Sequence, residues 1–185
     1  MAAAAPAVPA ADNGLALAPR IEPGHVPQLD DTERGLWMEV AELERELGNS
    51  QLLVRDERLN AYVRDVTCRV AKAYCPDLRV YVVRNPGFNA SMAPNGTLQV
   101  WTGLLLRAAT EDELASVLAH ELAHYVMAHT LAQFRRIRTS TGIGSLFSLG
   151  IGVATGVMLP IGELAALGDA MAFSRSQETE ADLLG

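Results

Sequence analysis

The residues with the clearest capacity for chemistry stand together as His120-Glu121-Leu122-Ala123-His124. Side chains at i and i+4 of a helix lie on one face, so both imidazoles can reach one metal ion. Glu121 lies about 100° round the helix from His120, where it can take a proton from a water at that metal. The alternative is a buried polar cluster without a metal, in which a carboxylate between two imidazoles would be costly. The pattern therefore indicates a catalytic site with one Zn²⁺ per chain.

A catalytic zinc ion takes a third protein ligand and keeps one position open. Of the other histidines, His25 lies in a proline-rich N-terminal segment. His129 follows His124 by five residues and would point about 140° away from it on a straight helix. We therefore expect His129 to be a structural histidine, and the third ligand to be a carboxylate.

The end of the chain offers Glu178 and Asp182, again at i and i+4 of a predicted helix. In the functional interpretation, Glu178 binds the metal. Asp182 accepts a hydrogen bond from the far nitrogen of a ligand histidine, which fixes the tautomer and the ring orientation. The alternative is a solvated acidic face, which would tolerate the mild repulsion between two carboxylates.

The elements that must position these residues are mostly helices. Thr110 and Glu113 form a capping box that opens the helix carrying both histidines, which we expect to end near Ala128. Helical spacing or capping residues predict the other helices. These run from about residue 31 to 47, 57 to 73, 130 to 138, 163 to 173, and 174 to the end of the chain.

Between the helices the pattern changes to that of strands. Residues 78–83 are rich in β-branched and aromatic side chains, and residues 88–92 and 97–101 follow as extended segments. The turns between them contain Asn85-Pro86-Gly87 and Pro94-Asn95-Gly96. We expect an α+β fold that is mostly helical, with a small, largely antiparallel sheet.

Composition and charge fit one folded domain. The chain has 185 residues, 49% of them hydrophobic, and a net charge of −7 without a cluster of basic residues, which excludes a nucleic-acid binder. Residues 1–29 are rich in Ala and Pro and are expected to form a flexible tail, with the domain at 30–185. Residues 1–11 have no basic or leucine-rich part, so they are not an intact signal peptide.

Cys68 and Cys75 leave two interpretations open. On one continuous helix their Cα atoms would be about 10 Å apart, beyond the reach of a disulfide, which favours two buried thiols. Pro76 turns Cys75 out of helical geometry, however, so the chain could fold back and allow a bridge.

Residues 139–162 carry no charge and are numerous enough to span a bilayer. A single crossing would separate His124 from Glu178 by about 30 Å of hydrocarbon, which is incompatible with a shared metal. We therefore expect a buried or lid-like segment over the cleft. The alternative is a re-entrant hairpin that makes peripheral contact with a membrane.

The paired motifs, with Glu178 and Asp182 following the two histidines, resemble the gluzincin family of zinc metallopeptidases. This family includes the heat-shock membrane protease HtpX, the CAAX prenyl endopeptidase and the periplasmic protease BepA. The resemblance covers roughly residues 30–185. Further matches are Asn89-Ala90, Pro94-Asn95-Gly96, Val100-Trp101-Thr102-Gly103-Leu104-Leu105 and Ser174-Arg175.

The resemblance implies a zincin-like fold and hydrolysis of peptide bonds in polypeptide substrates. It implies protein quality control in the bacterial periplasm or membrane-associated cell envelope. It also implies that the strand at 97–101 forms an edge of the cleft and pairs with the substrate, with Asn89, Thr97 and Gln99 as cleft residues.

The resemblance leaves two other functions open. The chain ends at Gly185, where similar proteins continue, so we expect a domain truncated at its C-terminus. One alternative is a non-catalytic assembly factor or chaperone stabilised by zinc. The other is an inactive truncated fragment.

Overall fold

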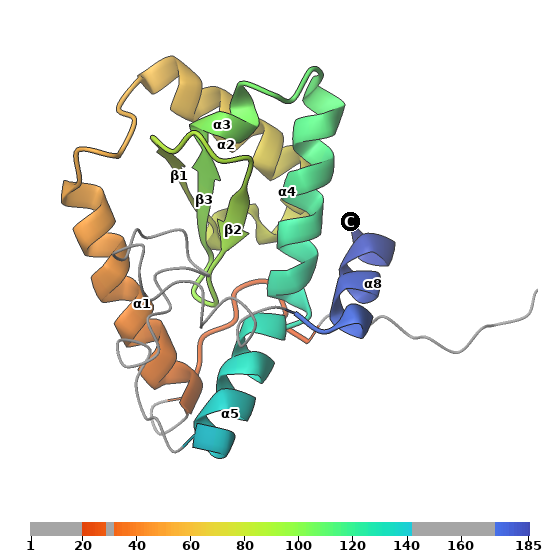
Figure 1. Cartoon of the computed structure of the whole chain (residues 1–185). Helices are drawn as coiled ribbons and strands as arrows, with labels where there is room; N and C mark the ends of the chain where they lie inside the picture. The colour runs from red at the N-terminus through yellow and green to blue at the C-terminus, as the bar shows by residue number, and fades with distance from the viewer. Residues whose placement is uncertain (1–19, 29–31, 142–172) are drawn as a thin grey trace, which may run out of the picture.

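The computed structural model describes residues 20–28, 32–141 and 173–185, in which helices surround a three-stranded sheet (Figure 1). All but the last residue of the predicted helix at 163–173, and most of the apolar run at 139–162, lie outside the described residues. No helix in the described part is long and apolar enough to cross a membrane. The elements are α1 (Thr32–Asn49), α2 (Glu57–Ala71), the 3₁₀ helix η1 (Lys72–Asp77), β1 (Arg79–Val83), β2 (Ala90–Met92), β3 (Thr97–Trp101), α3 (Thr102–Leu105), α4 (Glu111–Val126), α5 (His129–Thr141) and α8 (Arg175–Leu184).

The sheet is mixed, with the order β1-β3-β2, so the prediction of a largely antiparallel sheet is wrong for one of the two strand pairs. β3 lies in the centre, parallel to β1 and antiparallel to β2. β1 and β2 follow each other in the chain but are not neighbours in the sheet, because β3 lies between them. The Asn-Gly turn joins β2 to β3 as a hairpin. The prediction failed because three short strands with turns between them do not reveal which pairs are neighbours.

The core lies between the sheet and the helices α2 and α4. Leu98 and Val100 of β3 are fully buried there, together with Val63 of α2 and Leu118 of α4. The opposite face of the sheet is turned toward α1, which lies on the other side of the sheet from α4 (Figure 1). On that face Glu44 of α1 pairs with Arg79 of β1.

Cys68 and Cys75 form a disulfide, with Cα atoms 4.8 Å apart. The bridge is possible because α2 ends at Ala71 and the chain turns into η1, with Lys72 in a left-handed conformation (φ 51°). The argument for two free thiols assumed one continuous helix and is wrong for that reason. The other interpretation, in which the chain turns before Pro76 and allows a bridge, is the one that the structure confirms.

Residues 20–28, which belong to the predicted flexible tail, pack on the domain instead. Ile21 is buried, and the backbone amides of Arg20 and Ile21 donate hydrogen bonds to the carbonyl of Val126. The Tyr74 hydroxyl donates to the carbonyl of Ile21. Proline breaks helices and strands, but it does not prevent an extended segment from binding through its backbone. Residues 1–19 and 29 of the predicted tail lie outside the described residues.

The helices that carry the candidate site have capped N-termini. Thr110 accepts a hydrogen bond from the backbone amide of Glu113 and opens α4, and Ser174 with Gln177 forms a full capping box for α8. α4 ends at Val126, and Ala128 then adopts a left-handed conformation (φ 54°) before α5 begins. α8 packs against α4 (Figure 1) and brings the end of the chain to the two histidines.

Candidate metal centre

His120, His124 and Glu178 form a cluster that could hold a metal ion, with one ligand atom of each within 4.8 Å of the others. The Nε2 atoms of the two histidines are 3.0 Å apart. The Glu178 carboxylate lies 3.5 Å from Nε2 of His120 and 3.9 Å from Nε2 of His124. Donors 2.0–2.1 Å from a tetrahedral zinc ion would be about 3.3 Å apart, so these separations fit one ion after small adjustments.

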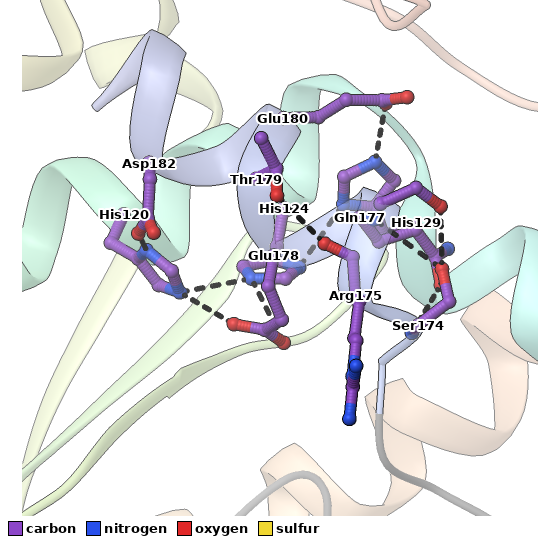
Figure 2. Close-up of polar contacts among 11 residues, drawn as sticks. His120, His124, His129, Ser174, Arg175, Gln177, Glu178, Thr179, Glu180 and Asp182 are labelled. Atoms are coloured by element: carbon purple, nitrogen blue, oxygen red, sulfur yellow. Dashed lines mark hydrogen bonds and ion pairs between the residues drawn. The ribbon is translucent and has the colours of Figure 1, made fainter.

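The hydrogen bonds around the cluster favour a bound cation. The Nδ1 atoms of His120 and His124 are each engaged with another side chain, 2.9 and 3.1 Å away (Figure 2). With Nδ1 as the protonated nitrogen of each ring, both Nε2 atoms present lone pairs to each other. Two lone pairs at 3.0 Å repel unless a proton or a metal ion lies between them. The donor set therefore fits a metal such as zinc.

Asp182 lies beside His120 at the position that the sequence predicts. Its Oδ1 is 2.9 Å from Nδ1 of His120, and its side chain is 73% exposed. The His120 side chain is 29% exposed. Glu178 and Asp182 point to the same side of α8 (Figure 2), which the spacing of four residues requires.

His129 lies against His124, although a straight helix would turn it away. Its Nδ1 is 3.1 Å from Nδ1 of His124, and its Nε2 is 3.1 Å from Oε2 of Glu180. The left-handed residue Ala128 breaks the helix and turns His129 back. The expected orientation of His129 is therefore wrong, because it assumed one uninterrupted helix.

His124 is enclosed on several sides. Its side chain is 3% exposed, and the Phe173 ring stacks on it with centroids 4.0 Å apart and an interplanar angle of 24°. Burial, together with His120 and His129, lowers the pKa of His124 to about 3. The imidazole is therefore neutral at physiological pH, which is the form that binds metals.

Glu121 lies between α4 and the free edge of the sheet. Burial and the charge of Glu178 raise the pKa of Glu121 to about 8, although a hydrogen bond from the backbone amide of Met92 lowers it. A bound cation would stabilise the ionised form. The Met92 contact ties the carboxylate to β2, the strand that runs beside α4.

The predicted cleft residues are placed differently from one another. Thr97 and Gln99 are buried in β3, which is paired on both sides, so this strand has no free edge. Thr97 accepts a hydrogen bond from Arg79 on the face toward α1. Asn89 precedes β2, and its carbonyl accepts a hydrogen bond from the Trp101 amide. The expectation that residues 97–101 pair with a substrate is wrong, because β3 is the central strand of the described sheet. Of the two edge strands, β1 and β2, it is β2 that packs against α4.

Three residues at the site were not predicted from sequence. Glu180 lies two residues from both Glu178 and Asp182, so an acidic residue at every second position was a visible signal. Met92 contributes through its backbone, which no side-chain pattern reveals. Phe173 falls at the end of a predicted helix and carries no chemistry that would single it out.

A capped α4 that presents two histidines and a glutamate, completed by carboxylates from α8, is the site architecture of HExxH metallopeptidases. The profile of peptidase family M48 matches residues 53–185, and the chain belongs to this family.

Named relatives agree with that assignment. The chain is 30% identical to the putative beta-barrel assembly-enhancing protease of Vibrio cholerae over 76% of its own length and 31% of the relative's. It is 35% identical to the mitochondrial metalloendopeptidase OMA1 of Schizosaccharomyces pombe, over 67% of this chain and 37% of that one. Protease HtpX of Legionella pneumophila is 33% identical over 68% of this chain and 52% of its own. The chain thus spans about a third to about half of the length of these relatives.

Proposed function

We propose that the chain is a zinc-dependent metalloendopeptidase, with His120, His124 and Glu178 as metal ligands and Glu121 as the general base. The observation that carries this proposal is the convergence of three ligand atoms beside the partly buried carboxylate of Glu121. Membership of peptidase family M48 supports it. Polypeptides are the substrate class that the family implies.

In this proposal each residue has a defined role. When bound, zinc acts as a Lewis acid toward water and the scissile carbonyl. Glu121 accepts the proton of the attacking water and delivers it to the leaving nitrogen, so the carboxylate ends in its starting state. Asp182 holds the His120 ring with its lone pair toward the metal. The amide of Met92 orients Glu121.

We infer that the substrate adds to the sheet along β2. Asn89 and Ala93 are bonded through their backbones to β3, so Ala90 and Met92, which alternate with them, direct their backbone groups to the free side. An extended peptide there could pair with the Ala90 amide and carbonyl and lie beside Glu121. This assigns to β2 the role that the family resemblance implied for the strand at 97–101.

The disulfide supports a location in the bacterial cell envelope, because such bonds persist in oxidising compartments and are rare in the cytosol. The relatives named for beta-barrel assembly point in the same direction, and quality control of envelope proteins is the role we propose. The rival functions are a zinc-stabilised assembly factor and an inactive fragment. Neither of them requires a base at Glu121.

The decisive experiment compares Glu121→Gln with the wild-type chain. Zinc content should stay at about one ion per chain, while cleavage of an unfolded protein substrate should fall by about 10²–10⁴-fold. Glu113→Gln is the matched control, because it makes the same change on the same helix. The Thr110 cap bonds the backbone amide of residue 113, and a glutamine oxygen can still accept from the Ala109 amide. Full activity of Glu121→Gln would remove the general-base role, and a wild-type chain that binds zinc without cleaving would favour the assembly factor.

A further inference from the structure

His129 and Glu180 form a second support for the metal centre, separate from Asp182. Glu180 Oε2, the two ring nitrogens of His129, and Nδ1 of His124 lie in one line of contacts, each 3.1 Å long (Figure 2). The far end of this line is Nε2 of His124, which faces the metal cluster. α8 therefore contacts Nδ1 of His120 directly and Nδ1 of His124 through an intervening ring.

The chemistry of the line allows one arrangement of protons if His124 binds metal through Nε2. Its Nδ1 must then carry the proton and donate to Nδ1 of His129. His129 can accept there only if its own proton is on Nε2, and that proton points at the Glu180 carboxylate. Glu180 thus selects the tautomer of His129, and His129 selects the tautomer of His124.

Burial makes this selection effective. His129 is 1% exposed, so water cannot replace either of its partners. Glu180 is 25% exposed on its side chain, compared with 73% for Asp182. A charged acceptor away from water makes a stronger hydrogen bond than a solvated one.

The backbone supports a dedicated role for His129. A left-handed conformation costs a residue with a Cβ roughly 1–2 kcal/mol, and Ala128 adopts it immediately before His129. Without this residue α4 would continue and carry His129 away from His124. Strain of this kind is retained where a particular side-chain position is needed.

We propose that His129 is a positioning residue of the metal centre, which together with Glu180 holds His124 in the tautomer and orientation that bind the metal. The inference rests on the proposed function, because it assumes that His124 is a ligand. His129 itself does not bind the metal.

The test uses substitutions that separate the two links. In His129→Asn the amide oxygen takes the place of Nδ1 and accepts from His124, but the side chain is too short to reach Glu180. In His129→Gln the amide nitrogen takes the place of Nε2 and reaches Glu180, but no acceptor faces His124. His129→Leu keeps the volume and removes both links.

The measurements are zinc affinity of the full chain, by competition with a chromophoric chelator, and the visible absorption spectrum of the Co²⁺-loaded chain. We expect His129→Asn to stay within about threefold of the wild type, and His129→Gln and His129→Leu to lose roughly 10- to 100-fold with an altered cobalt spectrum. Packing alone would give the reverse order, since Gln is closer to His in size than Asn. That reverse order, or an unchanged His129→Leu, would overturn the inference.

Glu180 provides a second test that spares the buried ring. Glu180→Ala should weaken zinc binding by about tenfold, and Glu180→Gln by less, because its amide oxygen still accepts from His129. Thr179→Ala is the matched control, since this neighbouring side chain bonds only within α8 and is exposed. Equal affinities for all three variants would contradict the inference. A wild-type chain that takes up no zinc would instead refute the proposed function.

Discussion

The two histidines of the candidate metal centre are supported in different ways. His120 is partly exposed and meets a solvated carboxylate, Asp182, directly. His124 is buried beneath Phe173 and meets the half-sheltered Glu180 through His129. One support is an exposed contact that water could partly replace, and the other is a packed line of side chains whose middle ring, His129, is buried. The comparison implies that one side of the site tolerates change and the other does not.

The largest difference should come from truncating each histidine. His120→Ala and His124→Ala should both lose the metal, but their metal-free forms should differ in stability. His124→Ala leaves a cavity and an unpaired His129, so the free energy of unfolding should fall by about 2 kcal/mol or more. His120→Ala should stay within about 1 kcal/mol of the wild type. Urea denaturation in the presence of a chelator measures the free energy of unfolding of both variants. Equal losses would contradict the difference between the two supports.

The disulfide lies outside both supports, so removing it tests whether a loss of stability alone changes zinc affinity. Replacing Cys68 and Cys75 with serine should lower the free energy of unfolding by about 2 kcal/mol, as expected for a cross-link that closes a short loop. Under conditions in which both the wild type and the variant are fully folded, zinc affinity should not change. Thermal denaturation and chelator competition measure the two quantities, and a parallel loss of both would mean that stability alone sets metal affinity.

Asp182 should matter less than His129. Asp182→Ala should weaken zinc binding by about tenfold at most, because water can take the place of an exposed acceptor. Competition with the same chelator, run beside His129→Leu, compares the two supports directly. A larger effect for Asp182→Ala would reverse the comparison.

A separate prediction concerns pH and Glu121, which belongs to neither support. In the metal-free chain its pKa is raised to about 8, so the folded state binds a proton that the unfolded state releases near pH 4.5. Stability should therefore fall by at least about 1 kcal/mol as pH rises from 5 to 8 in the absence of metal. Glu121→Gln should remove this slope, and urea titrations at several pH values would show it. A wild-type profile as flat as that of Glu121→Gln would contradict the pKa shift.

Local patterns account for the parts of the structure that the sequence predicts well. The caps at Thr110 and Ser174 and the spacing of His120, His124, Glu178 and Asp182 depend on residues within one or two helical turns. Helix geometry alone translates such spacing into a shared face. The helical positions of the proposed ligands could therefore be read before any tertiary contact was known.

The failures share a different cause. The order of the strands, the disulfide and the position of His129 all depend on where the chain changes direction. Two of those changes use left-handed residues that are not glycine, Lys72 and Ala128. Neither type signals a turn in a sequence, so the straight continuation of each helix was the natural expectation.

The distance along the chain between α4 and α8 has a mechanical consequence. His120 and Asp182 are 62 residues apart, so an ion bound by both helices would act as a cross-link that closes a large loop. A protease cut between residues 142 and 172 would open the backbone but leave two fragments joined through the metal and the packing of α8 on α4. On a native gel such a nicked chain should migrate as one species, and adding a chelator should release its C-terminal fragment. Release without chelator would mean that the ion does not hold the two parts together.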